Sequence, residues 1–368
     1  MIRITLLNQA ALRAYLGSAE FANSPVVPIV PLRAHSHLCN PRLHPADVLL
    51  LLAHAADGQL VGYLGVLPDT AFLASGEARH CGWLSCLWVS PAHRGQRIAQ
   101  QLLEQAFAAW NRQIFITEYT GPAEQLYRKT GYFRDLTTKA GIRLYLRADT
   151  ATLLPPRGRL FAQARPLLRL LDGAANAVLG LRQALGKAQP VATGGEYVAA
   201  LDADAEAEQF IRRQQGRQLA RRGAAELNWI ITNPWLRSAA QPDADGQRYH
   251  FSSVANPFGF YALKVRDARG ELAAFLVLAR RGNALKMPYC YHTGNVRQVA
   301  EVIFACLRQW RIATFTTFQP ELVQFLTAHA TPALLKRPVL RKYMVSNAIE
   351  GLPNEVEFQD GDADCSFT

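Results

Sequence analysis

The sequence predicts a mixed α/β fold, in which a mixed central sheet is flanked by helices and the whole unit occurs twice in tandem. Three observations support this prediction. The chain has 368 residues, which favours two domains over one. Hydrophobic residues make up 49% of the chain and charged residues 19%, so there is enough apolar material for packed cores. The same order of strand-like and helix-like segments appears in both halves.

In the first half, strand-like runs alternate with helix-like ones. Asp57-Gly58 is a strong hairpin signal between two apolar runs. Pro91 ends a later strand, because proline cannot donate to the ladder. Residues 98–110 are amphipathic and free of Gly and Pro, which predicts a helix. The expected strands are Ile2–Leu6, Val48–Ala55, Leu60–Leu67, Trp83–Val89, Ile114–Tyr119 and Ile142–Leu146, and the expected helices are Asn8–Leu16, Ile98–Trp110 and Ala123–Lys129.

The second half repeats this order. Asp267-Ala268-Arg269-Gly270 is a turn signal between two apolar runs, which predicts a hairpin. The two halves share no evident sequence identity, so the repeat is one of pattern only. The expected strands are Phe260–Val265, Leu272–Ala279, Leu285–Tyr291, Ile312–Phe318 and Val339–Ser346, and the expected helices are Val296–Trp310 and Glu321–Ala328.

These patterns divide the chain into a first domain over residues 1–150, a helical linker over 151–192, a second domain over 193–350 and an acidic tail over 351–368. In the linker, an apolar seam that begins at Leu167 and Leu171 predicts a long helix. We expect this helix to be a strap packed between the two domains; the alternative is a basic amphipathic helix on a membrane surface. The tail holds Asp360, Asp362 and Asp364, and we interpret it as solvated.

The net charge of +11 fits an anionic ligand such as a nucleotide-bearing cofactor, although a nucleic acid or an anionic membrane would also fit. No basic run is interleaved with aromatic residues, so we expect no nucleic-acid partner. The apolar run Val48–Ala53 is too short to span a bilayer, and the N-terminus lacks a secretory signal pattern. Six scattered cysteines without a CxxC pair indicate reduced thiols. We therefore expect a cytoplasmic protein without stable membrane insertion.

The most informative segment, at residues 87–99, is a strand, a short polar loop and the start of a helix. Backbone N–H groups at a helix start have no internal partner, and the helix dipole adds positive potential there. Such a loop can bind a pyrophosphate through its backbone. Gly95 and Ala99 are small enough for close approach, and Arg94 and Arg97 add positive charge.

This loop resembles the acetyl-CoA pyrophosphate motif of the GNAT superfamily, which is an Arg or Gln, two free positions, a Gly, one free position, and a Gly or Ala. Arg94 matches the first position and Ala99 the last, whereas Arg97 replaces the middle Gly. Residues 123–132 resemble the family's later helix, which ends in a Tyr, a basic residue, a Gly and an aromatic residue. The resemblance covers residues 1–147 and implies a GNAT fold there.

The resemblance also implies an N-acetyltransferase with acetyl-CoA as its co-substrate. Tyr127 would act as general acid for the leaving thiolate; the alternative is a buried helix aromatic with no catalytic role. The strand before the loop carries no carboxylate, so Glu118 on the next strand is the candidate general base. The implied cofactor-binding residues are Leu87, Trp88, Val89, Arg94, Gly95, Gln96, Arg97, Ile98 and Ala99.

Two other sets of residues admit alternative roles. Cys86, with His93 nearby in sequence, could accept the acyl group, but a small apolar core residue is the favoured interpretation. A Pro-rich loop gathers three histidines and a cysteine whose spacing matches no standard zinc motif, so we expect no metal and a loop that contacts the acceptor. These residues are His35, His37, Cys39 and His44.

Aromatic residues form a third open set. Tyr63 and Trp83 could line an acceptor pocket or belong to the core. Several residues of the second half could form an aromatic acceptor surface or be core and turn residues. They are Trp229, Trp235, Tyr249, His250 and Phe258.

The second half has no counterpart of the basic loop, because His292-Thr293-Gly294-Asn295 precedes its helix. We therefore expect a degenerate GNAT-like domain that binds no CoA. It would shape the acceptor site or pair with another chain as a homodimer.

The function we expect is direct transfer of an acetyl group to a small-molecule or peptide amine. One alternative is an acyl- or aminoacyl-transferase acting on a cell-envelope precursor, against which the intact acyl-CoA loop argues. The other is a non-catalytic protein that binds CoA or a partner, which the lack of an obvious base leaves open. The sequence does not identify the acceptor.

Overall fold

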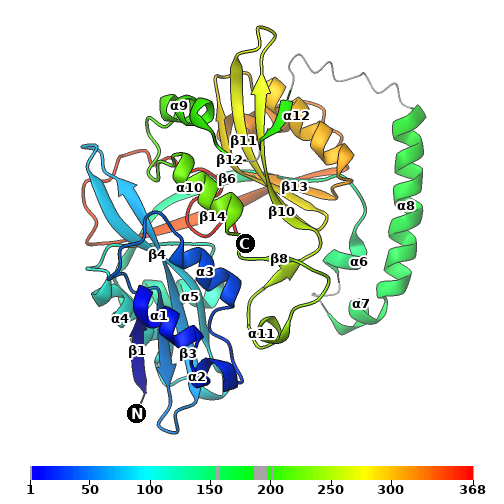
Figure 1. The fold of residues 1–368 in the computed structure, drawn as a ribbon. Helices are drawn as coiled ribbons and strands as arrows, with labels where there is room; N and C mark the ends of the chain where they lie inside the picture. Colours follow the sequence, from blue (N-terminus) through cyan, green and yellow to red (C-terminus); the bar gives the residue numbers. More distant parts are fainter. Residues whose placement is uncertain (1, 155–157, 186–196, 201, 368) are drawn as a thin grey trace.

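The computed structural model describes residues 2–154, 158–185, 197–200 and 202–367. Its centre is one mixed sheet of 12 strands that runs through both halves of the chain (Figure 1). The strands of the first half are β1 (Arg3–Leu7), β2 (Leu50–His54), β3 (Leu60–Phe72), β4 (Ala78–Val89), β5 (Ile114–Thr117) and β6 (Phe133–Tyr145). Those of the second half are β7 (Tyr197–Ala200), β10 (Phe258–Arg266), β11 (Leu272–Arg281), β12 (Ala284–His292), β13 (Thr314–Thr317) and β14 (Leu335–Ser346).

Helices flank the sheet. Those of the first half are α1 (Gln9–Leu16), α2 (Ala19–Asn23), α3 (Pro31–Leu38), α4 (Ile98–Ala109) and α5 (Gly121–Thr130). The middle of the chain forms α6 (Thr150–Leu153), α7 (Arg159–Gln163) and α8 (Arg165–Leu185). The second half forms α9 (Ala205–Gln214), α10 (Ala224–Thr232), α11 (Ala244–Gln247), α12 (Val296–Gln309) and α13 (Pro320–Ala328), and a small second sheet of β8 (Arg237–Ser238) and β9 (Val254–Ala255).

The predicted mixed α/β fold is confirmed, and so is the repeated order of elements. In each half a hairpin leads to a strand, a helix, a strand, a helix and a last strand. The helix α3 was not expected, because Pro31 fits its first turn but the residues after it gave no clear helical pattern. The division of the chain into domains at 150 and 193 stays a prediction.

The two halves exchange their last strands within the sheet. The order of strands is β1-β2-β3-β4-β5-β14-β6-β13-β12-β11-β10-β7. The strand β14 therefore lies between β5 and β6, and β6 pairs on its other edge with β13. All of these contacts are antiparallel, and the β6–β14 ladder runs the full length of β14. Each half thus contributes its last strand to the other half.

The core at this junction is shared between the halves. One cluster of buried side chains includes Trp83 and Phe115 from the first half, Phe275 and Tyr289 from the second, and Tyr343 from β14. Burying such large apolar side chains is the dominant favourable term in folding. The two halves therefore stabilise each other through a continuous core.

A buried ion network crosses the same junction. The carboxylate of Asp69 forms ion pairs of 2.6 Å with both Arg42 and Arg222. Burial alone would raise the pKa of Asp69, but Arg222 and Arg42 outweigh that effect and hold it at about 2. Arg222 also lies 3.4 Å from Asp362 of the C-terminal segment.

The C-terminal segment is buried, so the expectation of a solvated tail was wrong. Asp362 is 0% exposed and Phe367 is 2% exposed. The ring of Phe367 stacks on Trp235 at 4.4 Å, and the Asp362 carboxylate reaches Arg222. Ala363, Cys365 and Phe367 anchor the tail in the core, and Lys139 pairs with Asp360. Thr368 lies outside the described residues.

The helix α8 lies at the outer side of the molecule rather than between the two halves (Figure 1). It docks on α6 by a polar contact, in which Asp172 accepts a hydrogen bond of 3.0 Å from the backbone N–H of Thr150. Leu167 and Leu171 of the predicted seam are 59% and 57% exposed. The expectation of a strap packed between two domains was therefore wrong, because the apolar seam faces away from the body. Residues 186–192 of the predicted linker lie outside the described residues.

Across the ranges that the structure describes, every helix is too short or too polar to cross a bilayer.

Candidate functional site

The candidate site begins where strand β4 diverges from its parallel neighbour β5. The parallel strands β4 and β5 pair only at Gly82 and Trp83, and then diverge. The register between β3 and β4 shifts just after this point, and Cys86 takes a φ of 56°. Beyond this bulge, Leu87–Val89 do not pair with β5, which leaves the edge of β4 open for a ligand's amide groups. The binding of a cofactor to Leu87, Trp88 and Val89 stays a prediction.

The loop after β4 is exposed and enters α4 through residues with positive φ, Gly95 and Arg97. Residues 94–97 are exposed, and a Cβ built on Gly95, whose φ is +85°, would meet no atom within 4 Å. Arg97 caps the N-terminus of α4 with a φ of 57°, in the left-handed region. This is the conformation that a glycine adopts at little cost, so Arg97 keeps the backbone path of the motif at the expense of local strain. The binding of a pyrophosphate by this loop and the start of α4 stays a prediction.

Tyr127 lies on α5, which the sequence ends as predicted at Gly131, with a φ of +68°. The Tyr127 side chain is buried, and its ring contacts the edges of Tyr119 and Phe133 at 5.9 Å and 5.8 Å. Burial, and then the nearby charge of Asp364, raises the pKa of the phenol well above its usual range. The hydroxyl therefore keeps its proton at neutral pH, which is the form that a general acid requires.

Glu118 lies directly after β5, with a φ of 49°. Its carboxylate forms an ion pair of 2.8 Å with Arg341, a buried residue of β14. The exchanged strand therefore positions this side chain, which sequence patterns alone could not show. Whether Glu118 accepts a proton from the acceptor stays a prediction.

A buried polar cluster next to the bulge was missed by sequence reasoning. Arg33 of α3 donates to Ser85 at 2.7 Å and to Tyr249 at 2.9 Å, and it also contacts the Cys86 thiol. Ser85 in turn donates to the carboxylate of Asp364 at 2.5 Å. Burial raises the pKa of Asp364, so a proton can be held there at a higher pH than on an exposed carboxyl. No local pattern could have joined residues 33, 85, 249 and 364.

The remaining residues that the sequence analysis singled out have mainly structural roles. His93 contacts Ser90 at 3.4 Å, whereas Cys86 contacts Arg33 and Tyr249, so the pair proposed for an acyl-enzyme is not assembled. The aromatic residues whose roles were left open are mostly core. Tyr63, Trp83, Trp229, Trp235 and Tyr249 are buried, whereas His250 stacks on Trp88 and Phe258 is half-buried.

The histidine-rich segment does not form the group that its sequence suggested. His37 is buried and stacks on Trp235 at 5.1 Å, whereas His35 and Cys39 are exposed and contact each other at 3.6 Å. His44 instead gathers with Asp47 and His80, and their ligand atoms lie within 4.8 Å of one another. These three side chains could hold a metal ion, although His80 already pairs with Asp47 at 2.9 Å.

The equivalent place in the second half is filled by the chain itself. There β12 and β13 pair only from Ala284 to Lys286 and then diverge. The side-chain amide of Gln359 fills the gap: it accepts from the Cys290 N–H at 3.0 Å and donates to the Cys290 carbonyl at 3.2 Å. Asp360 accepts from the backbone N–H of Phe318 at 2.6 Å. The tail thus occupies the edge of β12 that a pantetheine arm would need.

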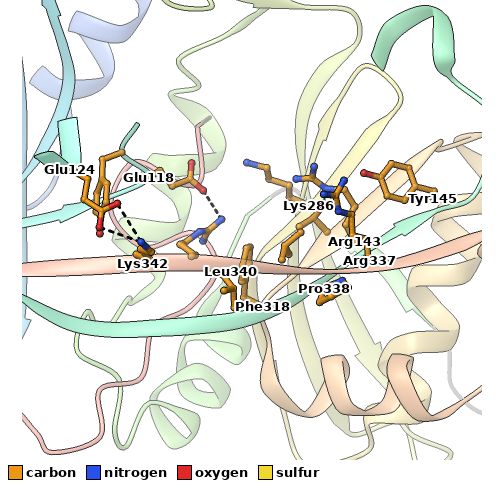
Figure 2. Close-up of a pocket in the computed structure, with 14 residues that line it drawn as sticks. Glu118, Glu124, Arg143, Tyr145, Lys286, Phe318, Arg337, Pro338, Leu340 and Lys342 are labelled. Carbon is orange, nitrogen blue, oxygen red and sulfur yellow. Dashed lines mark hydrogen bonds and ion pairs between the residues drawn. The ribbon is translucent and has the colours of Figure 1, made fainter. Parts of the chain in front are cut away.

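A cavity of about 630 Å³ lies beside Glu118 and extends between the two halves (Figure 2). It is lined by five basic and two acidic side chains, so its wall is strongly positive. The basic residues are Arg143, Lys286, Arg337, Arg341 and Lys342, and the acidic ones are Glu118 and Glu124.

Comparisons with known proteins agree with this geometry. Residues 20–132 match the acetyltransferase (GNAT) family. Three solved structures resemble 94% of the chain. One is a conserved Enterococcus faecalis protein of unknown function, a probable N-acyltransferase (11% identity, 72% of that chain, TM-score 0.53). The second is a GCN5-related N-acetyltransferase from Anabaena variabilis (12% identity, 72% of that chain, TM-score 0.51). The third is a GCN5-related N-acetyltransferase from Kribbella flavida (11% identity, 70% of that chain, TM-score 0.50). No curated protein matches the chain. At this identity the likeness shows a shared fold that includes both halves.

Proposed function

Residues 20–132 are a GNAT acetyltransferase domain, and from this premise we propose that the chain is an N-acetyltransferase that moves an acetyl group from acetyl-CoA to an amine. The observation that carries the proposal is the open edge of β4 followed by an exposed loop at the N-terminus of α4. An extended thioester and a pyrophosphate need these two features side by side.

In this proposal the cofactor lies along β4 and α4. The pyrophosphate accepts hydrogen bonds from the backbone of residues 94–99, and Arg94 and Arg97 neutralise its charge. The pantetheine amides bond to the backbone of Leu87–Val89. The thioester then lies near the bulge at Cys86, between Tyr127 and the polar cluster of Arg33.

The chemistry is a direct transfer. The lone pair of the acceptor nitrogen attacks the thioester carbonyl, a C–N bond forms and the C–S bond breaks. Tyr127 gives its proton to the departing sulfur, so CoA leaves as a thiol. The amine loses one proton to a base, and the phenol regains one from solvent.

Two carboxylates are candidates for that base. Glu118 lines the cavity and is held by Arg341. Asp364 is buried, and the direction of its pKa shift suits a base that works near neutral pH. Glu118→Gln and Asp364→Asn separate the two roles, because only the loss of the base moves the acid limb of the pH profile of kcat.

Isothermal titration with acetyl-CoA tests the binding step. We expect a Kd on the order of micromolar and one site per chain, since Gln359 fills the equivalent place in the second half. Gly95→Glu should abolish binding, because a carboxylate would face the pyrophosphate. Gly270→Glu is the matched control: its φ of +81° is also in the left-handed region and its surroundings are also open, but it lies in the β10–β11 hairpin of the second half. Equal affinities of both variants, or no heat with any acyl-CoA, would overturn the assignment.

A cytoplasmic location, a homodimer and the identity of the acyl group stay predictions of the sequence. A thiol-release assay with acetyl-, propionyl- and succinyl-CoA would decide among acyl donors.

A further inference from the structure

A row of three positive side chains and one threonine crosses four strands of the sheet along the cavity wall. In the ladders, Lys286 lies opposite Thr316, Thr316 opposite Arg143, and Arg143 opposite Arg337. Residues that lie opposite one another in a sheet point to the same face. We call these four residues the cation row. Arg143 and Arg337 are direct cross-strand neighbours, an arrangement of like charges that destabilises a sheet.

A similar pair four residues along the same ladder is neutralised by carboxylates of the chain. Lys139 lies opposite Arg341 on β6 and β14. Lys139 forms an ion pair of 3.2 Å with Asp360, and Arg341 forms one of 2.8 Å with Glu118. The fold therefore supplies carboxylates where two cations meet in its interior.

Carboxylates do not compensate the cation row in this way at Arg143, which is half-buried, or at Arg337, which is exposed to solvent. Within the described residues, neither guanidinium forms an ion pair with a carboxylate; Arg143 donates to the Thr316 hydroxyl at 2.9 Å, which fixes its position. Burial lowers the pKa of Lys286, and the nearby carboxylate of Glu118 opposes that shift. Two uncompensated guanidinium groups and a hydroxyl on one sheet face provide the donors that bind phosphate or carboxylate oxygens.

The cavity connects this row to the proposed catalytic residues. Figure 2 shows Arg143 and Arg337 grouped at one end of it and Glu124 at the other, with Lys286 and Glu118 between them. Tyr119, which contacts the edge of the Tyr127 ring, lines the same cavity. A volume of about 630 Å³ holds a metabolite-sized molecule. A ligand with its anionic group on the cation row can therefore extend toward the acyl group.

We propose that this cavity is the acceptor site, and that the acceptor is an amine that carries a phosphate or a carboxylate, bound by Arg143, Arg337 and Lys286. The inference rests on the proposed acetyltransferase function and names its substrate class. The anionic group binds in the ground state and in the transition state alike, so its loss affects KM more than kcat.

Three amines of similar length test the substrate class: propylamine, 3-aminopropyl phosphate and 4-aminobutanoate. With the full chain and saturating acetyl-CoA, we expect kcat/KM at least tenfold higher for one or both anionic amines than for propylamine, and the better of the two identifies the anion. In Arg337→Gln this preference should fall at least tenfold, through a higher KM for the anionic amines. Arg269→Gln, an exposed turn arginine of the second half, is the matched control and should keep the preference. Equal kcat/KM for all three amines, or a uniform loss with every amine in Arg337→Gln, would overturn the proposal.

A second measurement does not depend on activity. Inorganic phosphate should raise the Tm of the parent chain and of Arg269→Gln in the presence of saturating CoA, and should raise that of Arg337→Gln much less. Without phosphate, Arg337→Gln should be at least as stable as the parent, because it removes a like-charge pair. If no amine is acetylated but the phosphate effect depends on Arg337, the anion site stands and the proposed function fails. If phosphate acts equally on all three chains, the anion site itself is wrong.

Discussion

At the residue scale, two buried aspartates contact the same arginine, Arg222, and yet their pKa values shift in opposite directions. Asp69 has two arginine partners, and they hold its pKa at about 2. Asp362 has Arg222 at the longer distance of 3.4 Å, so burial outweighs that attraction and raises its pKa to about 6. The number of close cations around a buried carboxylate thus decides whether the folded protein holds it charged or protonated.

Asp362→Asn should change how stability depends on pH. The folded-state pKa of Asp362 is raised above the unfolded value of about 3.9. The stability that its protonated form contributes is therefore complete below about pH 3.9 and is lost as pH rises through about 6. Asparagine mimics the protonated form at every pH. The free energy of unfolding of the variant, relative to the parent, should therefore increase between pH 4 and pH 7 by up to about 3 kcal/mol, at about 1.4 kcal/mol per pKa unit. Urea titrations at the two pH values measure it, and a constant difference would contradict it.

Tyr127→Phe should separate chemistry from binding. The phenol is buried and protonated, so its loss removes the proton for the thiolate, and kcat should fall by about two to four orders of magnitude. The Kd for acetyl-CoA should change little. Tyr132→Phe is the control, because that ring stacks on Phe107 at 4.6 Å and has a packing role. Parent-like turnover in Tyr127→Phe would reduce Tyr127 to a core residue.

At the element scale, the junction of β4 with α4 carries strain at Arg97. A left-handed non-glycine residue costs roughly 1–2 kcal/mol, and the neighbouring Gly95 avoids that cost. A helix N-terminus that must present its N–H groups to a ligand leaves little freedom for the residue before it. A glycine at this position, as in the family's sequence motif, would adopt the same backbone conformation without this strain.

Arg97→Gly should stabilise the chain, whereas Arg97→Ala should not. Both variants remove the same charge, but only glycine relieves the φ of 57°. We expect Arg97→Gly to exceed Arg97→Ala by about 1 kcal/mol in free energy of unfolding, measured without CoA. Equal stabilities would show that the loop relaxes in solution.

At the scale of the whole molecule, the strand exchange makes the halves interdependent. The strand β14 is the joint neighbour of β5 and β6, and it also brings Arg341 to Glu118. The tail that follows β14 fills the open edge of β12 with Gln359 and reaches Ser85 with Asp364. The second half therefore helps to build the site in the first half, and the first half completes the sheet of the second.

A break after Ala148 should accordingly prevent the N-terminal piece from folding alone. Residues 1–148 lack β14, so β5 and β6 lose the strand between them and a shared core is exposed. We expect this piece to be insoluble by itself, and to form a CoA-binding complex when it is produced together with residues 149–368. Gel filtration and titration with CoA measure this. A soluble fragment that binds CoA alone would show that β6 can take the place of β14 beside β5.

The sequence by itself determined the local features of this protein. The hairpins, the strand–loop–helix around Gly95, the helix that carries Tyr127 and its end at Gly131 follow from periodicity, turn residues and capping, which act over a few neighbouring positions. Only the tertiary structure decided where β14 lies, that the aspartate-rich tail is buried, and that Arg143, Arg337 and Lys286 line one cavity. These contacts join residues more than a hundred positions apart, and their free energy comes from a shared core and from burying charges beside partners that no local pattern specifies.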